Sequence, residues 1–289
     1  MTGYRFVSKH RVDYPVARMC RVVQINRSGF YKWNGRSPSQ RDLDDAVLVG
    51  EITEIYEASR RTYGAPRIWG QLARRGINVG RKRVARLMRQ AGLVGVHARR
   101  KWRRGRLDVA PAADLVQRDF TADEPDRLWV ADITEFATRE GKLFLAGIVD
   151  VATSQIVGWS MATRQTSELV IDALVAAALR RNITTDLIHH SDRGSQYTSL
   201  AFTNRLEDLD LVPSFGSTGD CFDNAKMESF WATLKREITW ITGIETFDTR
   251  AELRAAIFDY IEMFYNRQRH QTGLGHLTPN EYEHEITAA

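Results

Sequence analysis

The chain has 289 residues, is 43% hydrophobic and carries a formal net charge of +5. This length is typical of about two domains, and the composition is sufficient for a sizeable core. No apolar run is long enough to cross a bilayer and no secretory signal precedes the first helix, so we expect a soluble intracellular protein. Cys20 and Cys221 belong to no C-x-x-C pair, which favours reduced thiols over a structural zinc site.

The positive charge is concentrated in one part of the chain. Residues 60–106 contain sixteen Lys and Arg and no Asp or Glu, whereas residues 107–289 contain sixteen basic and twenty-nine acidic residues. Solvated surfaces normally mix both signs, so this run is typical of a segment that binds the phosphates of nucleic acid. Binding to a membrane surface would require a large apolar helix face, which the run lacks.

Residues 1–40 are predicted to form an N-terminal helical arm. Residues 16–23 favour a short helix, residues 25–29 a turn, and residues 30–33 the start of a second helix. This pattern fits a small helix-turn-helix and fits equally well an arm that packs against the rest of the chain.

A helix-turn-helix DNA-binding domain with a basic tether is predicted over residues 41–106. Helices are expected at residues 41–59, 67–75 and 81–91, with a glycine-flanked turn before the last of them. The residues expected inside the last helix are Val84, Leu87, Met88 and Ala91, and those expected on its basic outer face are Lys82, Arg86 and Arg89. A linker at residues 107–122 follows.

From residue 123 to the end, strands alternate with helices. Strands are predicted at residues 127–136, 143–150, 155–161, 187–189 and 212–215, and helices at residues 167–181, 200–209, 223–239 and 249–267. Leu179 is expected among the core residues of the first of these helices. The order βββαβαβα is that of the ribonuclease-H-like fold. The fold class expected is therefore α/β, a ribonuclease-H-like catalytic core with an N-terminal all-α helix-turn-helix region.

Three acids occupy the places where this fold gathers its active-site carboxylates. Asp132 lies within the first strand, Asp192 follows the fourth, and Glu228 lies in the first turn of the helix after the fifth. Three ionised carboxylates repel one another, and hard divalent cations relieve this repulsion while accepting phosphate oxygens. We therefore predict that these three acids are both catalytic and metal-binding, with two Mg²⁺ ions for which Mn²⁺ can substitute.

Other polar residues near these acids have structural explanations. Asp150 ends a strand, so a turn or cap explains it better than a role as a fourth acid. Strand alternation places Glu135 on the face opposite Asp132. His189 is expected in the core and His190 beside the site.

The sequence around the acids resembles the DDE core of insertion-sequence transposases with retroviral-integrase-like catalytic domains, in particular the large insertion-sequence family three. The motifs are WVADIT at residues 129–134, HSDRGSQY at 190–197 and DNAKMESFW at 223–231. The family's thirty-five-residue spacing between the second Asp and the Glu is reproduced, as is its basic residue seven positions after the Glu, here Lys235. Trp231 in the last motif is expected to pack in the core.

This resemblance implies a polynucleotidyl transferase that binds the terminal inverted repeats of its element. The enzyme would expose a 3′-hydroxyl and use it to attack target DNA, by way of a copied-out circle. The resemblance further implies a cytoplasmic, nucleoid-associated bacterial protein that acts on DNA as at least a dimer. Lys235, Arg193 and Asn224 are expected to position the DNA.

In this family the active enzyme is often a frameshift fusion with an upstream-frame protein. Because the chain begins at Met1 without heptads, we expect it to be the downstream portion, with the upstream-frame protein as a partner. Two alternatives remain open from the sequence. A structure-selective nuclease of the same fold would cut DNA without joining it, and a non-catalytic regulator would use only the basic residues 60–106.

Overall fold

The structure is a computed structural model that describes residues 3–97, 122–181, 183, 186–216 and 225–288. It comprises two compact units, Met1–Glu51 and Ile52–Ala289. Within the described ranges, no helix combines the length and the apolar character that a membrane span requires.

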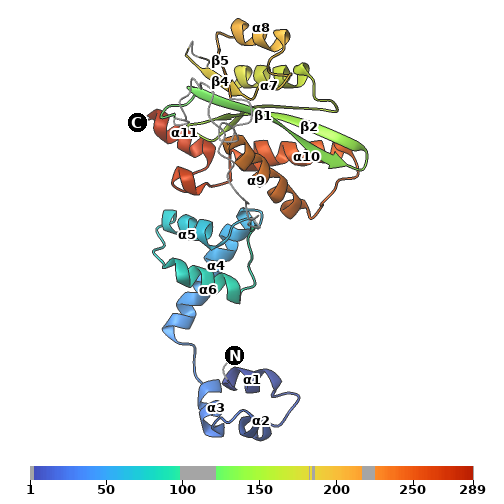
Figure 1. The fold of residues 1–289 in the computed structure, drawn as a ribbon. Coiled ribbons are helices and arrows are strands. Elements are labelled where there is room, and N and C mark those ends of the chain that lie inside the picture. Colours follow the sequence, from blue (N-terminus) through green and yellow to red (C-terminus); the bar gives the residue numbers. More distant parts are fainter. Residues whose placement is uncertain (1–2, 98–121, 182, 184–185, 217–224, 289) are drawn as a thin grey trace, which may run out of the picture. The chain divides into compact units, whose positions relative to one another are not determined.

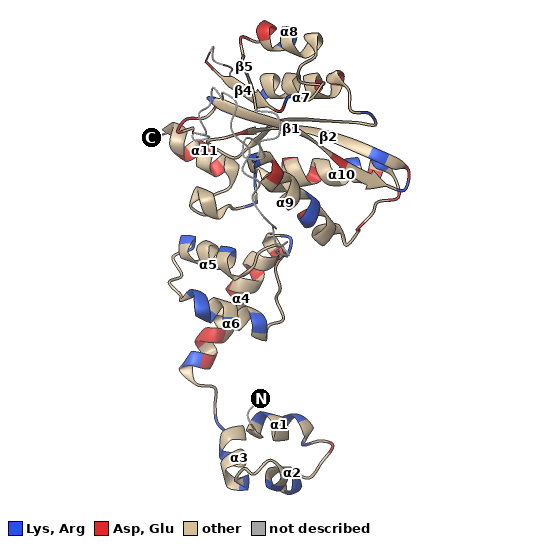
Figure 2. Cartoon of the chain, in the orientation of Figure 1, with Lys and Arg blue, Asp and Glu red and all other residues tan. Residues whose placement is uncertain are grey.

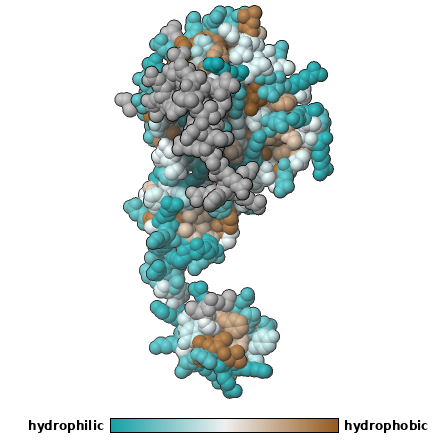
Figure 3. Space-filling view, viewed as in Figure 1, coloured by the Kyte–Doolittle hydropathy of each residue, from teal (hydrophilic) through white to brown (hydrophobic). Residues whose placement is uncertain are grey.

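The first unit contains three short helices, coloured blue in Figure 1. They are α1 (Gly3–His10), α2 (Val16–Val22) and α3 (Arg27–Asn34), and they are followed by the start of α4 (Gln40–Ala58). Val7, Met19, Cys20 and Phe30 form a buried cluster between the three helices. The predicted arm is thus a three-helix bundle with a core of its own, although apolar side chains are also exposed on its surface (Figure 3).

The second unit begins with the predicted helix-turn-helix. Its two helices are α5 (Ala65–Arg74) and α6 (Arg81–Gln90). Val84, Leu87 and Met88 are buried as predicted. The prediction for Ala91 was wrong, because α6 ends at Gln90 and Ala91 is its exposed C-cap residue.

A five-stranded sheet forms the centre of the second unit, in the order β3-β2-β1-β4-β5. The strands are β1 (Leu128–Thr138), β2 (Gly141–Asp150), β3 (Ile156–Ala162), β4 (Ile188–Ser191) and β5 (Val212–Phe215). The first three form the predicted antiparallel meander, and β4 lies parallel to β1 on its other side. This arrangement is the ribonuclease-H-like fold expected from the element order.

Helices cover both faces of the sheet (Figure 1). One layer is α7 (Ser167–Arg180) with α8 (Leu200–Asp208), and the other is α9 (Ala225–Thr242) with α10 (Arg250–Phe258). Alternation along β1 sends Trp129 and Ala131 into the core beneath α7 and α8, and Val130 into the core beneath α9 and α10. Leu179 was predicted to be buried on α7, but it is 84% exposed in the last turn.

The C-terminal part departs from the prediction of one helix over residues 249–267. Helix α10 ends at Phe258, and residues Asp259–Tyr265 continue as a π-helical segment, η1. A short 3₁₀ turn, Thr272–Leu274, and α11 (Pro279–Ala288) follow. In η1 the side chains of Tyr260, Ile261, Phe264 and Tyr265 are all buried.

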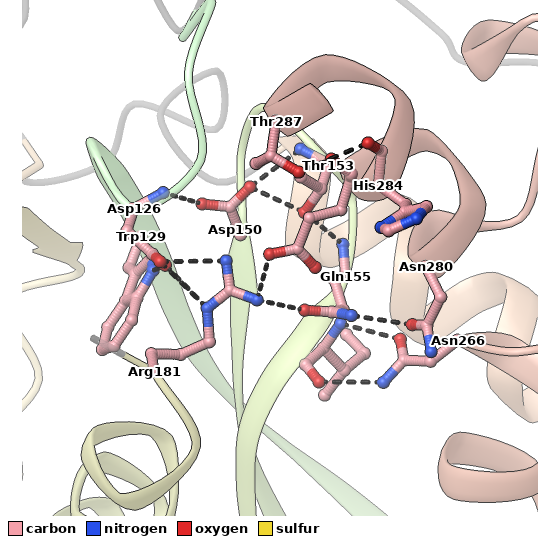
Figure 4. A network of polar contacts seen from close by, with 12 residues as sticks. Asp126, Trp129, Asp150, Thr153, Gln155, Arg181, Asn266, Asn280, His284 and Thr287 are labelled. Atoms are coloured by element: carbon pink, nitrogen blue, oxygen red, sulfur yellow. Dashed lines mark hydrogen bonds and ion pairs between the residues drawn. The ribbon is translucent and has the colours of Figure 1, made fainter. Parts of the chain in front are cut away.

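A polar network attaches α11 to the end of the sheet (Figure 4). Arg181 forms ion pairs with Asp126 and Glu283, and it donates a hydrogen bond to Gln155. The fully buried Asp150 accepts hydrogen bonds from Thr153 and from the backbone N–H of Asp126. The bonds of Asp150 to Thr153 and of Arg181 to Gln155 hold the turn between β2 and β3, which agrees with a structural role for Asp150.

A buried carboxylate on α9 joins the domain of the central sheet to the helix-turn-helix. Glu237, which is 2% exposed, accepts two hydrogen bonds from Arg269, at 2.7 and 2.8 Å, and one from the Tyr260 hydroxyl at 2.8 Å. The guanidinium of Arg67 on α5 lies 3.5 Å from the same carboxylate. Burial opposes ionisation of Glu237, but the charge and hydrogen bonds of Arg269 lower its pKa overall.

We expect Arg269→Ala to lower the free energy of unfolding by about 3–5 kcal/mol, because it leaves the buried Glu237 carboxylate without its main partner. Urea unfolding followed by tryptophan fluorescence measures this change. The matched control is Arg139→Ala, which breaks an exposed ion pair with Asp248 and should change the free energy by about 0–1 kcal/mol. Equal effects of the two substitutions would contradict the central role given to the buried pair.

Candidate active site

Asp132 lies in β1 on the face covered by α9. The indole N–H of Trp231 donates a hydrogen bond of 2.9 Å to its Oδ2 atom. Asp132 pairs across the sheet with Gly147, where an added Cβ would lie 2.7 Å from the Trp231 ring. The glycine therefore provides the space in which the indole reaches the carboxylate.

Asp192 directly follows the last residue of β4. In the parallel pairing of β1 and β4, Val130 lies opposite His190, so Asp132 and Asp192 each lie two residues beyond the last pair of this register. The backbone N–H of Gly194 donates to the Asp192 Oδ1 at 3.0 Å. A Cβ added to Gly194 would lie 2.9 Å from that oxygen, so a side chain there would displace the carboxylate.

Glu228 lies exposed in the first turn of α9, one turn before Trp231. Its charge is one of the causes that raise the pKa of Asp132 from the ordinary 3.8 to about 6. Burial is the main cause, the Trp231 hydrogen bond opposes it, and the charges of Asp192 and Glu228 raise the pKa further. Asp192 and Glu228 are therefore each close enough to Asp132 to interact with it electrostatically.

The donor atoms at this site fit a hard divalent cation, since all are carboxylate oxygens. In the described part of the chain, however, no group of three or more His, Cys, Asp or Glu side chains is arranged to hold a metal ion. Asp192 and Glu228 are exposed, whereas Asp132 is fixed by Trp231. Ligation of one ion by all three would therefore require their carboxylates to rearrange.

Lys235 lies almost two turns after Glu228 on α9, near the acids. Burial lowers its pKa, while the charges of Glu135 and Asp132 act in the opposite direction. Its ammonium lies 5.0 Å from the centroid of the Phe136 ring. Lys235 therefore presents a cation beside the carboxylates on the same helix that supplies Glu228.

The other predicted DNA-contacting residues lie at two places. Arg193 is exposed next to Asp192, and Asn224 falls outside the described residues. On α6, Lys82 and Arg89 are exposed, and Arg86 donates a hydrogen bond to Gln90 at 3.0 Å. The α6 residues thus form a cationic surface on the helix-turn-helix, as Figure 2 shows for the helix as a whole.

The two adjacent histidines of β4 point to opposite sides of the sheet. His189 is buried against the rings of Tyr197 and Phe202, and burial lowers its pKa to about 4, as expected of a core residue. The His190 Nδ1 lies 2.9 Å from the Ser214 hydroxyl on β5.

Two residues near the acids have roles that the sequence did not reveal. Trp231 is buried as predicted, but its indole also contacts Asp132. Tyr197 is buried where the charges of both Asp132 and Asp192 raise its pKa, after burial as the main cause. The position of Trp231 three residues after Glu228 places both on adjacent turns of one helix, and this spacing is the signal that could have found it.

Comparison with known proteins identifies the domains of the chain. Models of an integrase core domain match residues 122–221 and 228–286, and a model of a helix-turn-helix-like domain matches residues 42–101. The chain is 36% identical to the transposase InsF of insertion sequence IS3A from Escherichia coli K12, over 99% of each chain. It is 38% identical to the transposase of insertion sequence element IS629 from Shigella sonnei, over 96% of this chain and 94% of that one.

The chain belongs to the IS3-type family of insertion-sequence transposases. A 31 kDa protein of insertion element IS600 from Shigella sonnei is 42% identical over 93% of this chain and all of its own length. Among solved structures, a simian T-cell lymphotropic virus intasome is similar over 75% of this chain and 70% of its own, with 16% identity and a TM-score of 0.49. The activity of the family is DNA strand cleavage and strand transfer, so this transposase is a polynucleotidyl transferase.

We expect Asp132→Asn to raise the stability of the metal-free transposase at pH 7.5. The pKa of Asp132 is about 6 in the folded state and 3.8 in the unfolded state, so the folded state binds this proton more tightly. The resulting stabilisation of the folded state is fully present below pH 3.8 and is lost as the pH rises through about 6. Removing the charge should then increase the free energy of unfolding at pH 7.5 by on the order of 2–3 kcal/mol. Unfolding in the presence of a chelator at pH 4.5 and pH 7.5 measures the difference.

The control for this experiment is Asp172→Asn, at an exposed position of α7, which should have the same small effect at both pH values. A wild-type protein that is more stable than Asp132→Asn at pH 7.5 would contradict the proposed cost of ionising this half-buried carboxylate.

We expect Trp231→Phe to fold normally but to reduce DNA cleavage by about 10- to 100-fold, because the Asp132 carboxylate loses the donor that orients it. The loss of that donor also raises the pKa of Asp132, so the pH at which activity is half-maximal should move upward. Trp240→Phe is the matched control, since its indole donates to the Arg61 carbonyl away from the acids. An unchanged rate and pH profile for Trp231→Phe would rule out this orienting role.

Proposed function

We propose that Asp132, Asp192 and Glu228 are the catalytic, metal-binding carboxylates of this transposase. The proposal is supported by the half-buried Asp132 on the central strand β1, whose pKa is raised mainly by burial and further by the charges of Asp192 and Glu228. We further propose two Mg²⁺ ions as the cofactor, with Mn²⁺ as a substitute. Such ions activate an attacking oxygen and stabilise a leaving oxygen in phosphoryl transfer.

The proposed reaction has two steps at phosphorus. In the first, water attacks a phosphodiester at the element end, one P–O bond forms, another breaks, and the strand leaves with a free 3′-hydroxyl. In the second, that hydroxyl attacks another phosphodiester, and a different 3′-hydroxyl leaves. Each step exchanges one P–O bond for another, so strand transfer needs no external energy source and no covalent protein–DNA intermediate.

The residues of the chain would position these groups. Asp132, oriented by Trp231, would form one side of the site, with Asp192 after the end of β4 and Glu228 on α9 as the other ligands. Lys235 and Arg193 would contact the phosphates next to the reacting bond, with Asn224 as a further contact. Lys82, Arg86 and Arg89 would bind the element end through α6.

The domain division that we propose is a helical region at residues 1–40, the helix-turn-helix with tether at 41–106, a linker at 107–122 and the catalytic core at 123–289. The partners that we propose are the terminal inverted repeats and target DNA, a second copy of the chain and the upstream-frame protein as a fusion. Joining two ends requires at least two subunits on the DNA. The proposed location is the bacterial cytoplasm, with the nucleoid DNA.

The test of this function is a strand-transfer assay with labelled element-end DNA and Mg²⁺ or Mn²⁺. We expect joined products from the wild type and a loss of both cleavage and joining of at least about 100-fold in Asp192→Asn and Glu228→Gln, because each removes an anionic metal ligand. Chelation should abolish both steps, and added Mg²⁺ should restore them.

Glu207→Gln, at an exposed position of α8, is the control and should retain wild-type rates. Cleavage without joining would instead support a structure-selective nuclease. Full activity of Asp192→Asn would show that the site assignment is wrong.

A further inference from the structure

The N-terminal three-helix bundle lies outside the regions matched by the family models, the first of which begins at residue 42. We propose that residues 3–36 form a second helix-turn-helix module, which binds duplex DNA through α3, separately from the module of α5 and α6. This proposal extends the DNA binding of the proposed function to a part of the chain to which that function assigns no role.

The backbone of α2 and α3 has the form of a helix-turn-helix. Only four residues, 23–26, separate the two helices, and Gln24 within them has a left-handed conformation with a φ of 54°. The N–H of Ile25 donates to the Cys20 carbonyl at 2.9 Å and closes the turn. The Asn26 side chain then caps α3 by accepting from the N–H groups of Ser28 and Gly29. Short turns of this kind fix the second helix across the first.

The third helix packs through one face and leaves the other free for a ligand. Phe30 is buried in the bundle, and an added Cβ on Gly29 would lie 2.6 Å from the Tyr4 hydroxyl of α1, so these residues define the inner face. The residues exposed on the opposite face are Arg27, Ser28, Tyr31 and Lys32. Their spacing of i, i+1, i+4 and i+5 places all four on one side of the helix.

These four side chains have the chemistry of a DNA-reading helix. Arg and Lys donate to phosphates and to the guanine edge in the major groove, and Ser and Tyr hydroxyls contact phosphates or bases. Arg27 and Ser28 lie in the first turn of α3, the part of a recognition helix that meets base edges. The guanidinium of Arg27 lies 5.7 Å from the Tyr31 ring centroid, which restricts it to this face.

The net positive charge of residues 3–36 favours a polyanion over a protein as the partner of this module. Residues 3–36 contain eight Lys and Arg, and Asp13 is their single acid. Figure 2 shows blue segments on all three helices and red only at the connection between α1 and α2. A protein partner docked on exposed apolar groups such as Val22 would not require this excess of positive charge. Duplex DNA is the partner that matches both the charge and the helix-turn-helix geometry.

The experiment compares two double variants of the full-length protein that lose the same charge. Arg27→Ala with Lys32→Ala removes the cations of the α3 face, while Arg5→Ala with Lys9→Ala removes two exposed cations from α1, outside the motif. Binding to element-end duplexes and to a duplex of unrelated sequence is measured from low to high salt, together with a hydroxyl-radical footprint. Thermal unfolding verifies that both variants fold.

For the α3 variant we expect binding to the element end to weaken by about 10- to 100-fold. The slope of log K against log salt should become shallower by about 2, which corresponds to the loss of two phosphate contacts. One segment of the footprint should disappear while the segment protected by α6 remains. The α1 variant should change affinity less than about 3-fold and keep the whole footprint.

An unchanged affinity, salt slope and footprint in the α3 variant would overturn the proposal. So would equal losses in both variants, which would indicate a general effect of charge, or a loss of self-association without a loss of DNA binding, which would indicate a protein-docking surface. Two other measurements test the proposed function separately. They are the DNA binding of a triple variant on α6, with Lys82→Ala, Arg86→Ala and Arg89→Ala, and the cleavage assay of Asp192→Asn. The α3 module can therefore fail while the transposase assignment stands.

Discussion

The ion pair between Glu237 and Arg269 is the constraint on which the catalytic half of this transposase depends. A carboxylate as deeply buried as Glu237 is tolerated only where its charge and lone pairs are satisfied, and Arg269 and Tyr260 satisfy them. Glu237 and Glu228 share α9 and lie nine residues, about 14 Å, apart along its axis. Fixing Glu237 therefore fixes the helix that presents Glu228 to the strand bearing Asp132.

The same carboxylate also determines how the helix-turn-helix joins the core within the second unit. Arg67 of α5 approaches Glu237, the N–H of His270 donates to the Tyr63 hydroxyl, and the Trp240 indole donates to the Arg61 carbonyl. These contacts are directional hydrogen bonds and ion pairs, which specify one geometry more strictly than apolar contacts of equal area. The helix that carries Glu228 and Lys235 is thus in direct contact with the segment that leads into the DNA-binding helices.

The sequence predicted the parts of this structure that depend on local pattern and chain order. The meander and the β1–β4 adjacency follow from the element order, and they make the strand of Asp132 a neighbour of the strand that Asp192 follows. The predictions were wrong where the spacing of apolar residues continues past the point at which the α-helical backbone ends or changes to a π-helix. Ala91 and Leu179 keep the spacing of buried residues but lie at helix ends, and the π-helical turn at Asp259–Tyr265 keeps the composition of an ordinary helix. The contact of Trp231 with Asp132 joins residues 99 positions apart, so the position of Trp231 one turn after Glu228 was the signal for it in the sequence.

The environment of Asp132 shows a conflict between stability and activity that is resolved within the fold. A strand carboxylate beneath a helix is costly to ionise, and two further acids nearby increase that cost. A core built for stability alone would place an apolar side chain there. The fold instead supplies one indole N–H, makes room for that indole with Gly147, and leaves Asp192 and Glu228 exposed. One carboxylate is thereby oriented by a buried indole while the other two lie exposed at the surface, which suits a site whose charge is balanced only when its ligands are present.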